Sequence, residues 1–298
     1  MAFFVYFSMA HSIALIDFSW CLYRTRFSYR NMARCDTSGV LLPIGHIYGA
    51  LSIIQQLSKQ FKAVILCVDS PVPHRYEVLP EYKSGRHIAV GNPFEDYNIM
   101  SDLLNVLKLC TFSKNVFYIK HEGMESDDIL ASWIATAGDK WDLHCYFIDN
   151  DILQTKGSYH WYRSFHESET DRREYVKGRY GINLDYLPIW YKVVRGDASD
   201  CIPAAIPRFS SKKLVSICEA SENDCFGVGW FYEAVGLITK GGKVINQKLV
   251  DAVSRNLSVV SPRILDTSDF KLNRFNITYE EGQELLSYYQ VVNLVLGG

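Results

Sequence analysis

Nine carboxylate side chains lie where apolar segments end or helical segments begin, and they are the residues of this chain best suited to do chemistry. Asp17 and Asp69 each end an apolar run, and the other seven fall in three short clusters. These clusters are Glu125-Ser126-Asp127-Asp128, Asp149-Asn150-Asp151 and Asp197-Ala198-Ser199-Asp200. Gathered carboxylates repel one another unless a cation lies among them, and oxygen-only ligand sets suit Mg²⁺ or Mn²⁺. The pattern predicts a divalent-metal site that holds two or more ions.

Each cluster also has a plainer interpretation. Asp127 and Asp128 precede an apolar helical segment, so they would also serve as N-terminal caps. Asp149 and Asp151 point to one side if the preceding strand continues, but such pairs are also common in turns. The last cluster places two acids three residues apart, on one face of a helical turn. The metal site is favoured because capping and turn formation would have to place each of these acids at the same edge of the sheet independently.

Hydrolysis of a phosphodiester is the reaction that this inventory supports. Two divalent ions can activate a water and stabilise a leaving oxygen, and that chemistry needs many carboxylates but no nucleophilic side chain. The chain has no Walker A loop, GxGxxG, GxSxG or HExxH motif, and its eight histidines lack zinc spacing. Cations near the acids would face a phosphate, and Tyr82 would stack on a base, although a solvated loop is the alternative. These residues are Arg24, Arg75, Tyr82, Lys83 and Arg86.

Apolar runs alternate with helix-like segments, which predicts a mostly parallel sheet flanked by helices. Expected strands cover 13–16, 63–68, 116–119 and 143–148, and expected helices cover 44–61, 101–109 and 127–137. Parallel strands gather functional groups at their carboxyl ends, where Asp17, Asp69 and Asp149 stand. Segment 71–93 is interpreted as a functional loop or lid, and helices are expected at 210–220 and 280–296. Residues 288–296 form either a packed helix or a docking tail.

Composition sets wide bounds. The chain has 298 residues with 48% hydrophobic content, enough for one large domain or a domain with an appendage. Its net charge of −2 is no global sign of nucleic-acid binding, but acids committed to metals leave the rest of the surface positive. The eight cysteines form no CxxC pair, which favours reduced thiols and the cytoplasm. Segment 1–17 is interpreted as a variable leader and a buried strand, with neither a targeting signal nor a membrane segment.

Six segments together resemble the 5′-nuclease family of flap endonucleases, bacteriophage 5′-3′ exonucleases and the 5′-nuclease domain of bacterial DNA polymerase I. They occur in family order over about residues 13 to 215, and the size of the chain favours a phage-encoded member. The segments are ALIDFSWCLYR (14–24), GHIYGA (45–50), CVDSPVPHR with EYKSGR (67–75 and 81–86), MESDDILA (124–131), FIDNDILQ (147–154) and VVRGDASDCIP (193–203).

The resemblance implies a role for each matching residue. The first metal site would use Asp17, Asp69, Glu125 and Asp127. The second site and its outer shell would use Asp128, Asp149, Asp151, Asp197 and Asp200. Lys83 would contact the scissile phosphate with Arg86 beside it on a helical arch, and Arg24 would contact a phosphate. Tyr82 would stand at the base of the arch, and Arg75 would also contact nucleic acid.

Two departures from the family pattern change what is expected. The family's helix-hairpin-helix glycines are missing from 201–210, so Lys212 and Lys213 are expected to contact phosphates there, and a role for K⁺ is left open. The expected arch, 86–100, carries few basic residues and includes Glu95 and Asp96. Trimming of 5′ ends or removal of short flaps is therefore favoured over threading of a long single strand.

The expected protein has a PIN-like α/β catalytic domain at 1–195 and a helical DNA-binding region at 196–298 with a degenerate helix-hairpin-helix. The expected function is Mg²⁺-dependent cleavage of DNA at 5′ ends or flaps, with RNA–DNA hybrids as further substrates. It would act as a monomer in the cytoplasm, which is the cytoplasm of the host cell if the chain is phage-encoded. No membrane contact is expected, and replication proteins are possible partners. The alternatives are a branched-DNA-binding protein that does not cut, and a PIN-type ribonuclease with fewer acids.

Overall fold

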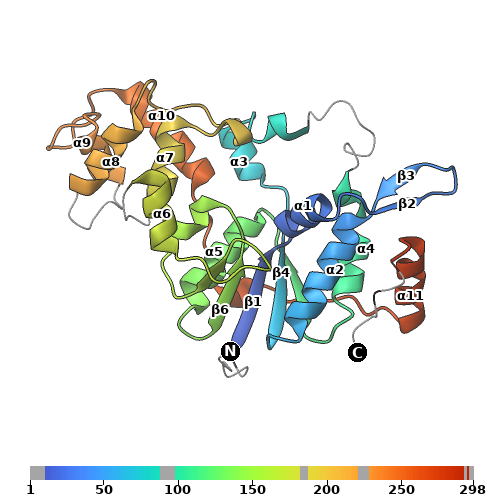
Figure 1. Ribbon diagram of the computed structural model, residues 1–298. Coiled ribbons are helices and arrows are strands. Elements are labelled where there is room, and N and C mark those ends of the chain that lie inside the picture. The colour runs from blue at the N-terminus through green and yellow to red at the C-terminus, as the bar shows by residue number, and fades with distance from the viewer. Residues whose placement is uncertain (1–10, 88–97, 182–186, 221–227, 292–293, 295–298) are drawn as a thin grey trace.

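A five-stranded parallel sheet forms the centre of the computed structural model, which describes residues 11–87, 98–181, 187–220, 228–291 and 294 (Figure 1). The strand order is β5-β4-β1-β6-β7, and every neighbouring pair runs parallel. The strands are β1 (Ser12–Asp17), β4 (Ala63–Val68), β5 (Val116–Lys120), β6 (Asp142–Tyr146) and β7 (His160–Tyr162). The expected mostly parallel sheet flanked by helices is confirmed, and the short β7 is an additional strand.

Helices cover both faces of this sheet because its central strands are apolar on both sides. Ala14 and Ile16 of β1 pack with one group of helices, whereas Ile13 and Leu15 face the other side. The first face is covered by α1 (Phe18–Ser28), α2 (Gly45–Ser58) and α4 (Leu103–Cys110). The second face is covered mainly by α5 (Ser126–Ala137), with α6 (Arg172–Tyr180) beyond it. The sheet's carboxyl edge is therefore held between two packed layers.

A glycine lets α2 approach α1 closely. A Cβ added at Gly49 would lie 2.5 Å from the Cβ of Thr25, which is closer than real Cβ contacts. The close approach fixes the axis of α1, whose first turn is capped by Asp17. The GHIYGA segment thus positions one of the carboxylates indirectly. A short hairpin, β2 (Ala33–Cys35) and β3 (Leu41–Pro43), joins α1 to α2.

A second, helical part lies beyond the carboxyl edge of the sheet (Figure 1). Its core joins Val193, Phe231 and Val253 with Val72 and Leu79, which come from the segment after β4. Its helices are α3 (Pro73–Val78), α7 (Leu187–Arg195), α8 (Ser211–Ala220), α9 (Val228–Ala234) and α10 (Gln247–Val260). Segment 71–87 is thus partly helical rather than an open loop, and 88–97, most of the expected arch, lie outside the described residues. The expected division between residues 195 and 196 stays a prediction, with α7 and α8 sharing one core.

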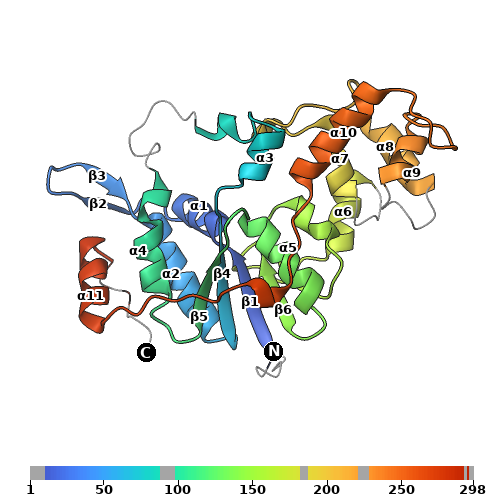
Figure 2. The ribbon, with the colours of Figure 1, turned by 180° about the vertical axis from the view of Figure 1, so that it is seen from behind.

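The chain after α10 returns to the sheet, as Figure 2 shows from behind. We call residues 261–278 the C-terminal strap. Asn273 of the strap exchanges two backbone hydrogen bonds with Tyr118 of β5, at 2.8 and 2.9 Å. The strap ends in α11 (Tyr279–Tyr288), which packs against α4. Helix α11 stops short of residue 296, because Gln290 adopts a left-handed backbone conformation with φ of 56°.

A buried polar network holds α11 in place. The hydroxyl of Tyr289 donates a 2.8 Å hydrogen bond to Asp102, and Asp102 also contacts Nε2 of His46 at 2.9 Å. Tyr289 is 1% exposed, so the first residues after α11 are packed against the domain. Across the part of the chain that the structure describes, no helix is long and apolar enough to span a membrane.

Candidate active site

Three carboxylates meet where β1, β4 and α5 come together. Asp17 ends β1 and caps α1 by accepting a 3.1 Å hydrogen bond from the backbone N–H of Trp20. Asp69 follows β4 and accepts a 2.8 Å bond from the backbone N–H of Ser126. The hydroxyl of Ser126 reaches Asp17 at 3.1 Å, and the hydroxyl of Ser19 donates to Asp69. The first residue of α5 therefore bridges two strand-end carboxylates and places Asp127 beside them.

A second group surrounds an ammonium. Lys192 of α7 lies 2.7 Å from Asp151 Oδ2, 3.3 Å from Asp149 Oδ1 and 3.3 Å from Asp197 Oδ2. Asp149 does not extend β6, because it caps a 3-10 turn by accepting a 3.0 Å bond from the N–H of Asp151. The sequence left a continued strand and a turn open for this pair, and the structure shows the turn; both acids still converge on one place. Asp197 caps a 3-10 turn that ends at Asp200, as the three-residue spacing predicts.

Both groups open onto one cleft of about 530 Å³, which contains Asp17, Asp69, Asp127, Asp149 and Lys192. The cleft lies at the carboxyl edge of the sheet and is covered on one side by the helical part. A single substrate group entering the cleft would meet both sets of carboxylates. This arrangement matches the convergence that the strand ends predict.

The carboxylates of this cleft are hard to ionise together. Burial, followed by the charge of Asp69, raises the pKa of Asp17 to about 7. Burial and the charges of Asp149 and Asp17 raise the pKa of Asp127 well above its usual range. Burial and Asp149 likewise raise the pKa of Asp151, although Lys192 acts in the opposite direction. A cation placed among these groups would restore their ionised forms.

Two carboxylate oxygens fit a metal ion especially well. Asp127 Oδ1 and Asp151 Oδ1 are buried, and neither accepts a hydrogen bond from any residue that the structure describes. A buried acceptor without a partner costs free energy, and a bound cation removes that cost. The donor set consists of oxygen atoms, which suits Mg²⁺ or Mn²⁺. The residues present therefore fit divalent ions, one beside Asp127 and one beside Asp151.

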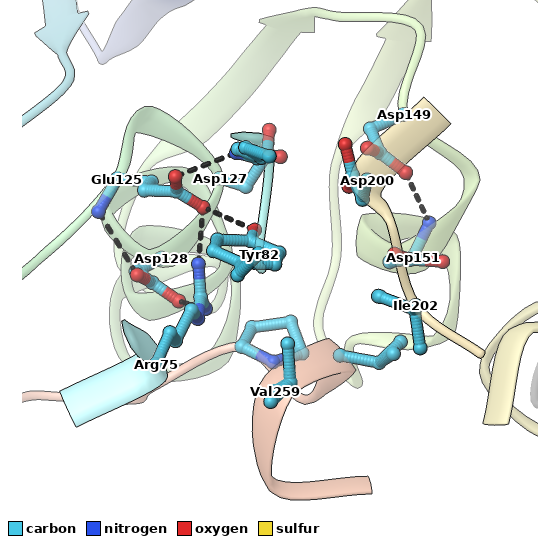
Figure 3. Close-up of a pocket in the computed structure, with 13 residues that line it drawn as sticks. Arg75, Tyr82, Glu125, Asp127, Asp128, Asp149, Asp151, Asp200, Ile202 and Val259 are labelled. Carbon is cyan, nitrogen blue, oxygen red and sulfur yellow. Dashed lines mark hydrogen bonds and ion pairs between the residues drawn. The ribbon is translucent and has the colours of Figure 1, made fainter. Parts of the chain in front are cut away.

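Glu125 and Asp128 face a buried arginine instead (Figure 3). Arg75 donates to Glu125, and its other nitrogen lies 2.7 Å from Asp128 Oδ1. Asp128 also accepts a 2.9 Å bond from the N–H of Glu125 and a 2.8 Å bond from the N–H of Arg263. Burial alone would lower the pKa of Arg75, but the charges of Asp128 and Glu125 outweigh burial and raise it. This cluster is an internal ion-pair network.

That network changes the interpretation of three residues. Figure 3 draws a smaller pocket that shares Lys83, Asp127 and Asp149 with the cleft. Asp128 was expected in the second metal site or its outer shell, but it lies next to Arg75, across this pocket from Asp149 and Asp151. Arg75 was expected to contact nucleic acid, yet it is 4% exposed and its guanidinium is engaged by two carboxylates. Tyr82 was expected to stack on a base, yet it is 4% exposed and its hydroxyl donates to Glu125 at 3.0 Å. All three side chains are buried, and none of them lines the cleft.

Lys83 lies at the border between this network and the cleft. Its ammonium is 2.5 Å from Glu125 Oε1, and its charge acts on Asp127. Two backbone contacts tie its loop to the Asp197–Asp200 turn: Lys83 N–H to the carbonyl of Asp200 at 2.9 Å, and Gly85 N–H to the sulfur of Cys201 at 3.3 Å. The position of the lysine therefore depends on the turn that carries the last acids.

The remaining basic residues are more dispersed. Arg24 stacks over Trp20, 5.7 Å from the ring centroid, and donates a 3.1 Å bond to Ser164. Lys212 and Lys213 are exposed on the first turn of α8, away from the carboxylates. Arg86 falls in a 3-10 turn, and its side chain lies outside the described residues. The acidic residues of the expected arch, 95 and 96, also lie outside them.

Sequence reasoning missed Lys192, Ser126 and Ser19. Lys192 is 41 residues from Asp151, and only the packing of α7 brings them together. Ser126 stands inside the ESDD segment, where its position between two acids at a helix start was a usable signal. Ser19 stands two residues after Asp17, in the first turn of α1.

The chain matches proteins of known family over most of its length. A family model described as 5′-3′ exonuclease, N-terminal resolvase-like domain, covers residues 12–181. A 5′-3′ exonuclease of Buchnera aphidicola is 26% identical over 226 residues, which is 71% of each chain. The structure of a bacteriophage T5 5′-exonuclease with bound zinc shares the fold, with a TM-score of 0.63, 18% identity, and coverage of 85% of this chain and 90% of that chain.

The catalytic core of Rad2 in complex with a DNA substrate also shares the fold, with a TM-score of 0.52 and 14% identity over 94% of this chain and 88% of that chain. These likenesses agree with the resemblance carried by the six sequence segments. Because the family model spans more than half of the 298 residues, this protein belongs to the 5′-3′ exonuclease family.

Proposed function

We propose that this protein is a structure-specific 5′ nuclease that hydrolyses phosphodiester bonds at 5′ ends or flaps of DNA, with Mg²⁺ as its natural ion. Membership of the exonuclease family supports the reaction class. The observation that carries the proposal is the pair of buried oxygens on Asp127 and Asp151 that accept no hydrogen bond from the described residues. Both residues line the pocket drawn in Figure 3, and further acids accompany them, as a site for two divalent ions requires.

The two groups of acids would divide the metal binding between them. Asp17, Asp69 and Asp127 would hold one ion, and Asp149, Asp151 and Asp197 the other. When bound, the ions supply an activated water and positive charge against the scissile phosphate and the leaving oxygen. Ser126 keeps the carboxylates of the first group in fixed orientations through its amide and hydroxyl. Glu125 serves the site by holding Lys83, and it is a direct ligand only if that ion pair opens.

Lys83 and Lys192 would act on charge rather than on protons. The ammonium of Lys83 lies close enough to Asp127 to influence its pKa, so a phosphate bound at the first ion would meet a positive charge. Lys192 shares the space among Asp149, Asp151 and Asp197, and it keeps their mutual repulsion low before an ion enters. Both lysines are fixed by charge-assisted hydrogen bonds, which limits the reorganisation needed during the reaction.

Contacts to DNA would come from exposed cations at the edge of the cleft and on α8. Lys212 and Lys213 are exposed and separate from the acids, so they would bind phosphates without touching the reacting bond. Such contacts carry no sequence information, which suits an enzyme that recognises the shape of a 5′ junction. They also make binding sensitive to salt concentration.

The test compares cleavage of a 5′-labelled duplex, a 5′-flap substrate and a flap with a blocked 5′ end. Wild-type protein with Mg²⁺ is expected to cut the first two, and EDTA is expected to stop cleavage. Asp149→Asn is expected to abolish cleavage, while Asp139→Asn, an exposed aspartate outside the cleft, is the matched control. A parallel set with an RNA 5′ segment measures whether hybrids are also substrates.

Cleavage that survives Asp149→Asn or EDTA would contradict the proposed metal site. Tight binding of flap DNA without cleavage by the wild type would indicate a branched-DNA-binding protein instead. Cleavage of single-stranded RNA alone would favour the ribonuclease alternative. The blocked flap separates enzymes that need a free 5′ end, whether they trim it or thread it, from an enzyme that recognises the junction itself.

A further inference from the structure

A cluster of histidines and carboxylates lies at the end of the sheet opposite the cleft. Asp142 and His144 are two residues apart on β6, so their side chains share one face. His160 of β7 pairs in register with His144, which places the two imidazoles side by side. Asp142 starts β6 next to Ser12, which starts β1, whereas Asp17 is the last residue of β1 and Asp149 follows the end of β6. The cluster is therefore separated from the catalytic acids by the length of the strands.

The atoms that face each other in this cluster are all metal-ligand types. Nε2 of His144 is 3.1 Å from Asp142 Oδ2, and Nε2 of His160 is 3.1 Å from Asp142 Oδ1. One ligand atom from each of the three residues lies within 4.8 Å of the others. The side chains of Asp142 and His160 are 32% and 33% exposed, so an ion in solution can reach them. A carboxylate bridging two imidazole nitrogens thus forms a polar cluster that solvent can reach.

The second nitrogen of each imidazole is oriented by a further polar group. Nδ1 of His160 lies 2.9 Å from the carboxylate of Glu169, and Nδ1 of His144 lies 2.9 Å from the hydroxyl of Tyr162. The hydroxyl of Ser12 donates a 2.8 Å bond to Asp142. Metal-bound histidines usually donate their other N–H to a carboxylate or similar acceptor, which fixes the ring and its tautomer. The outer partners of a metal site are therefore present around all three residues.

We propose that Asp142, His144 and His160 form a second metal site, separate from the catalytic acids, for a nitrogen-binding ion such as Zn²⁺ or Co²⁺. Imidazole nitrogen suits these ions, whereas Mg²⁺ prefers oxygen ligands alone. Metal–nitrogen distances of about 2.0–2.1 Å in tetrahedral geometry place ligand atoms about 3.3 Å apart. The rings are stacked in this structure, 4.6 Å between centroids and 22° from parallel, so binding of one ion by both nitrogens requires the two rings to turn out of the stack until their planes meet at the ion.

The ion would join β6 to β7, the last strand of the sheet. Because β7 has three residues, it contributes few backbone hydrogen bonds of its own, and a shared metal would hold it firmly in register. Three protein ligands leave one tetrahedral position for water. The histidine spacing, sixteen residues from 144 to 160, has no sequence signature of a zinc site, because strand pairing rather than a local motif brings the ligands together.

Co²⁺ is the probe that tests this site, because nitrogen-bound tetrahedral Co²⁺ absorbs visible light strongly. The full-length protein is titrated with Co²⁺ in excess Mg²⁺, which competes for the oxygen-only cleft. One equivalent of the absorbing species is expected for the wild type. We expect His160→Ala to weaken Co²⁺ binding by about 100-fold or more. Glu169→Gln is expected to weaken it about 10-fold to 100-fold, as loss of an outer-shell partner does.

Matched controls separate this site from the cleft and from general effects of substitution. His166→Ala and Glu167→Gln remove an exposed histidine and an exposed glutamate nearby and are expected to leave Co²⁺ binding unchanged. His160→Ala is expected to keep Mg²⁺-dependent cleavage, since the cleft lies at the other end of the strands. A wild type that gives no absorbing species, or an unchanged titration with folded His160→Ala and Glu169→Gln proteins, would overturn the proposal. If the wild-type protein does not cleave DNA, that result contradicts the proposed nuclease function and not the proposal of this second metal site.

Discussion

Removing divalent metal should make the protein lose stability as the pH rises from about 5 to 7, opposite to the usual behaviour of aspartates. The pKa of Asp17 in the folded protein is raised from its ordinary 3.8 to about 7. Between these values the folded protein keeps a proton that the unfolded chain releases. Stability therefore falls with increasing pH through this window, and the contribution of Asp17 levels off above about pH 7.

The size of this effect follows from the shift. One pH unit corresponds to about 1.4 kcal/mol for each group, and a shift of roughly three units gives about 4 kcal/mol for Asp17 alone. Asp127 and Asp151 act in the same direction because their pKa values are also raised. The pKa values of Asp142 and Asp197 are lowered, so their contributions fall below pH 4. Burial lowers the pKa of His144 from its ordinary 6.5, so this group opposes the trend up to about pH 6.5.

The assay is urea unfolding in EDTA at pH 5, 6, 7 and 8, repeated with saturating Mg²⁺. Without metal, the free energy of unfolding is expected to fall toward pH 7, and Asp17→Asn should make that fall shallower by about 1.4 kcal/mol per pH unit. Asp139→Asn is the control. Mg²⁺ should stabilise the protein most at pH 8, where the carboxylates bind it without first losing protons. A flat or rising profile in EDTA, or an unchanged slope in Asp17→Asn, would refute the reasoning.

Three further predictions concern single side chains. Arg75→Met should destabilise the protein by about 3–5 kcal/mol in urea unfolding, because it leaves the buried Asp128 without a counter-charge and Glu125 with Lys83 as its remaining cation. A loss of DNA affinity at unchanged stability would instead support the nucleic-acid contact that the sequence predicts for Arg75. Lys83→Ala should slow single-turnover cleavage about 100-fold with little change in DNA affinity. Lys212→Ala should mainly weaken DNA binding. If Lys83→Ala affects cleavage and DNA binding equally, the role assigned to Lys83 is wrong. Tyr289→Phe should cost about 1 kcal/mol, because the hydroxyl donates to Asp102 and accepts from Asn105, and an unchanged melting temperature would show that these two bonds contribute nothing.

The positions of Asp17 and Asp69 could be predicted because an apolar strand that stops at an acid is visible in the sequence. Parallel strands then require those acids to meet at one edge, and the structure brings them together through Ser126. The local turn at Asp149 was less predictable, since the Asp-Asn-Asp sequence after β6 is compatible with a turn and with a continued strand, and the sequence alone does not decide between them.

Residues placed by distant packing were beyond sequence reasoning. Arg75 and Tyr82 look like exposed members of a basic loop, but the helical part covers them and Glu125 engages both. Lys192 approaches the acids only because α7 docks beside the turn after β6. No local pattern reveals such contacts, since they depend on elements that are far apart in the chain.

The C-terminal strap affects how molecules of this protein associate with one another. β5 is the outermost strand on its side of the sheet, and unpaired outer strands are templates on which other chains add. Asn273 donates a backbone hydrogen bond to Tyr118 and accepts one from it, so the strap covers part of the outer edge of β5 within the same molecule. A chain that stopped before residue 270 would keep every catalytic acid but uncover β5. Such truncated chains should therefore assemble into intermolecular sheets, and the strap acts as protection against aggregation.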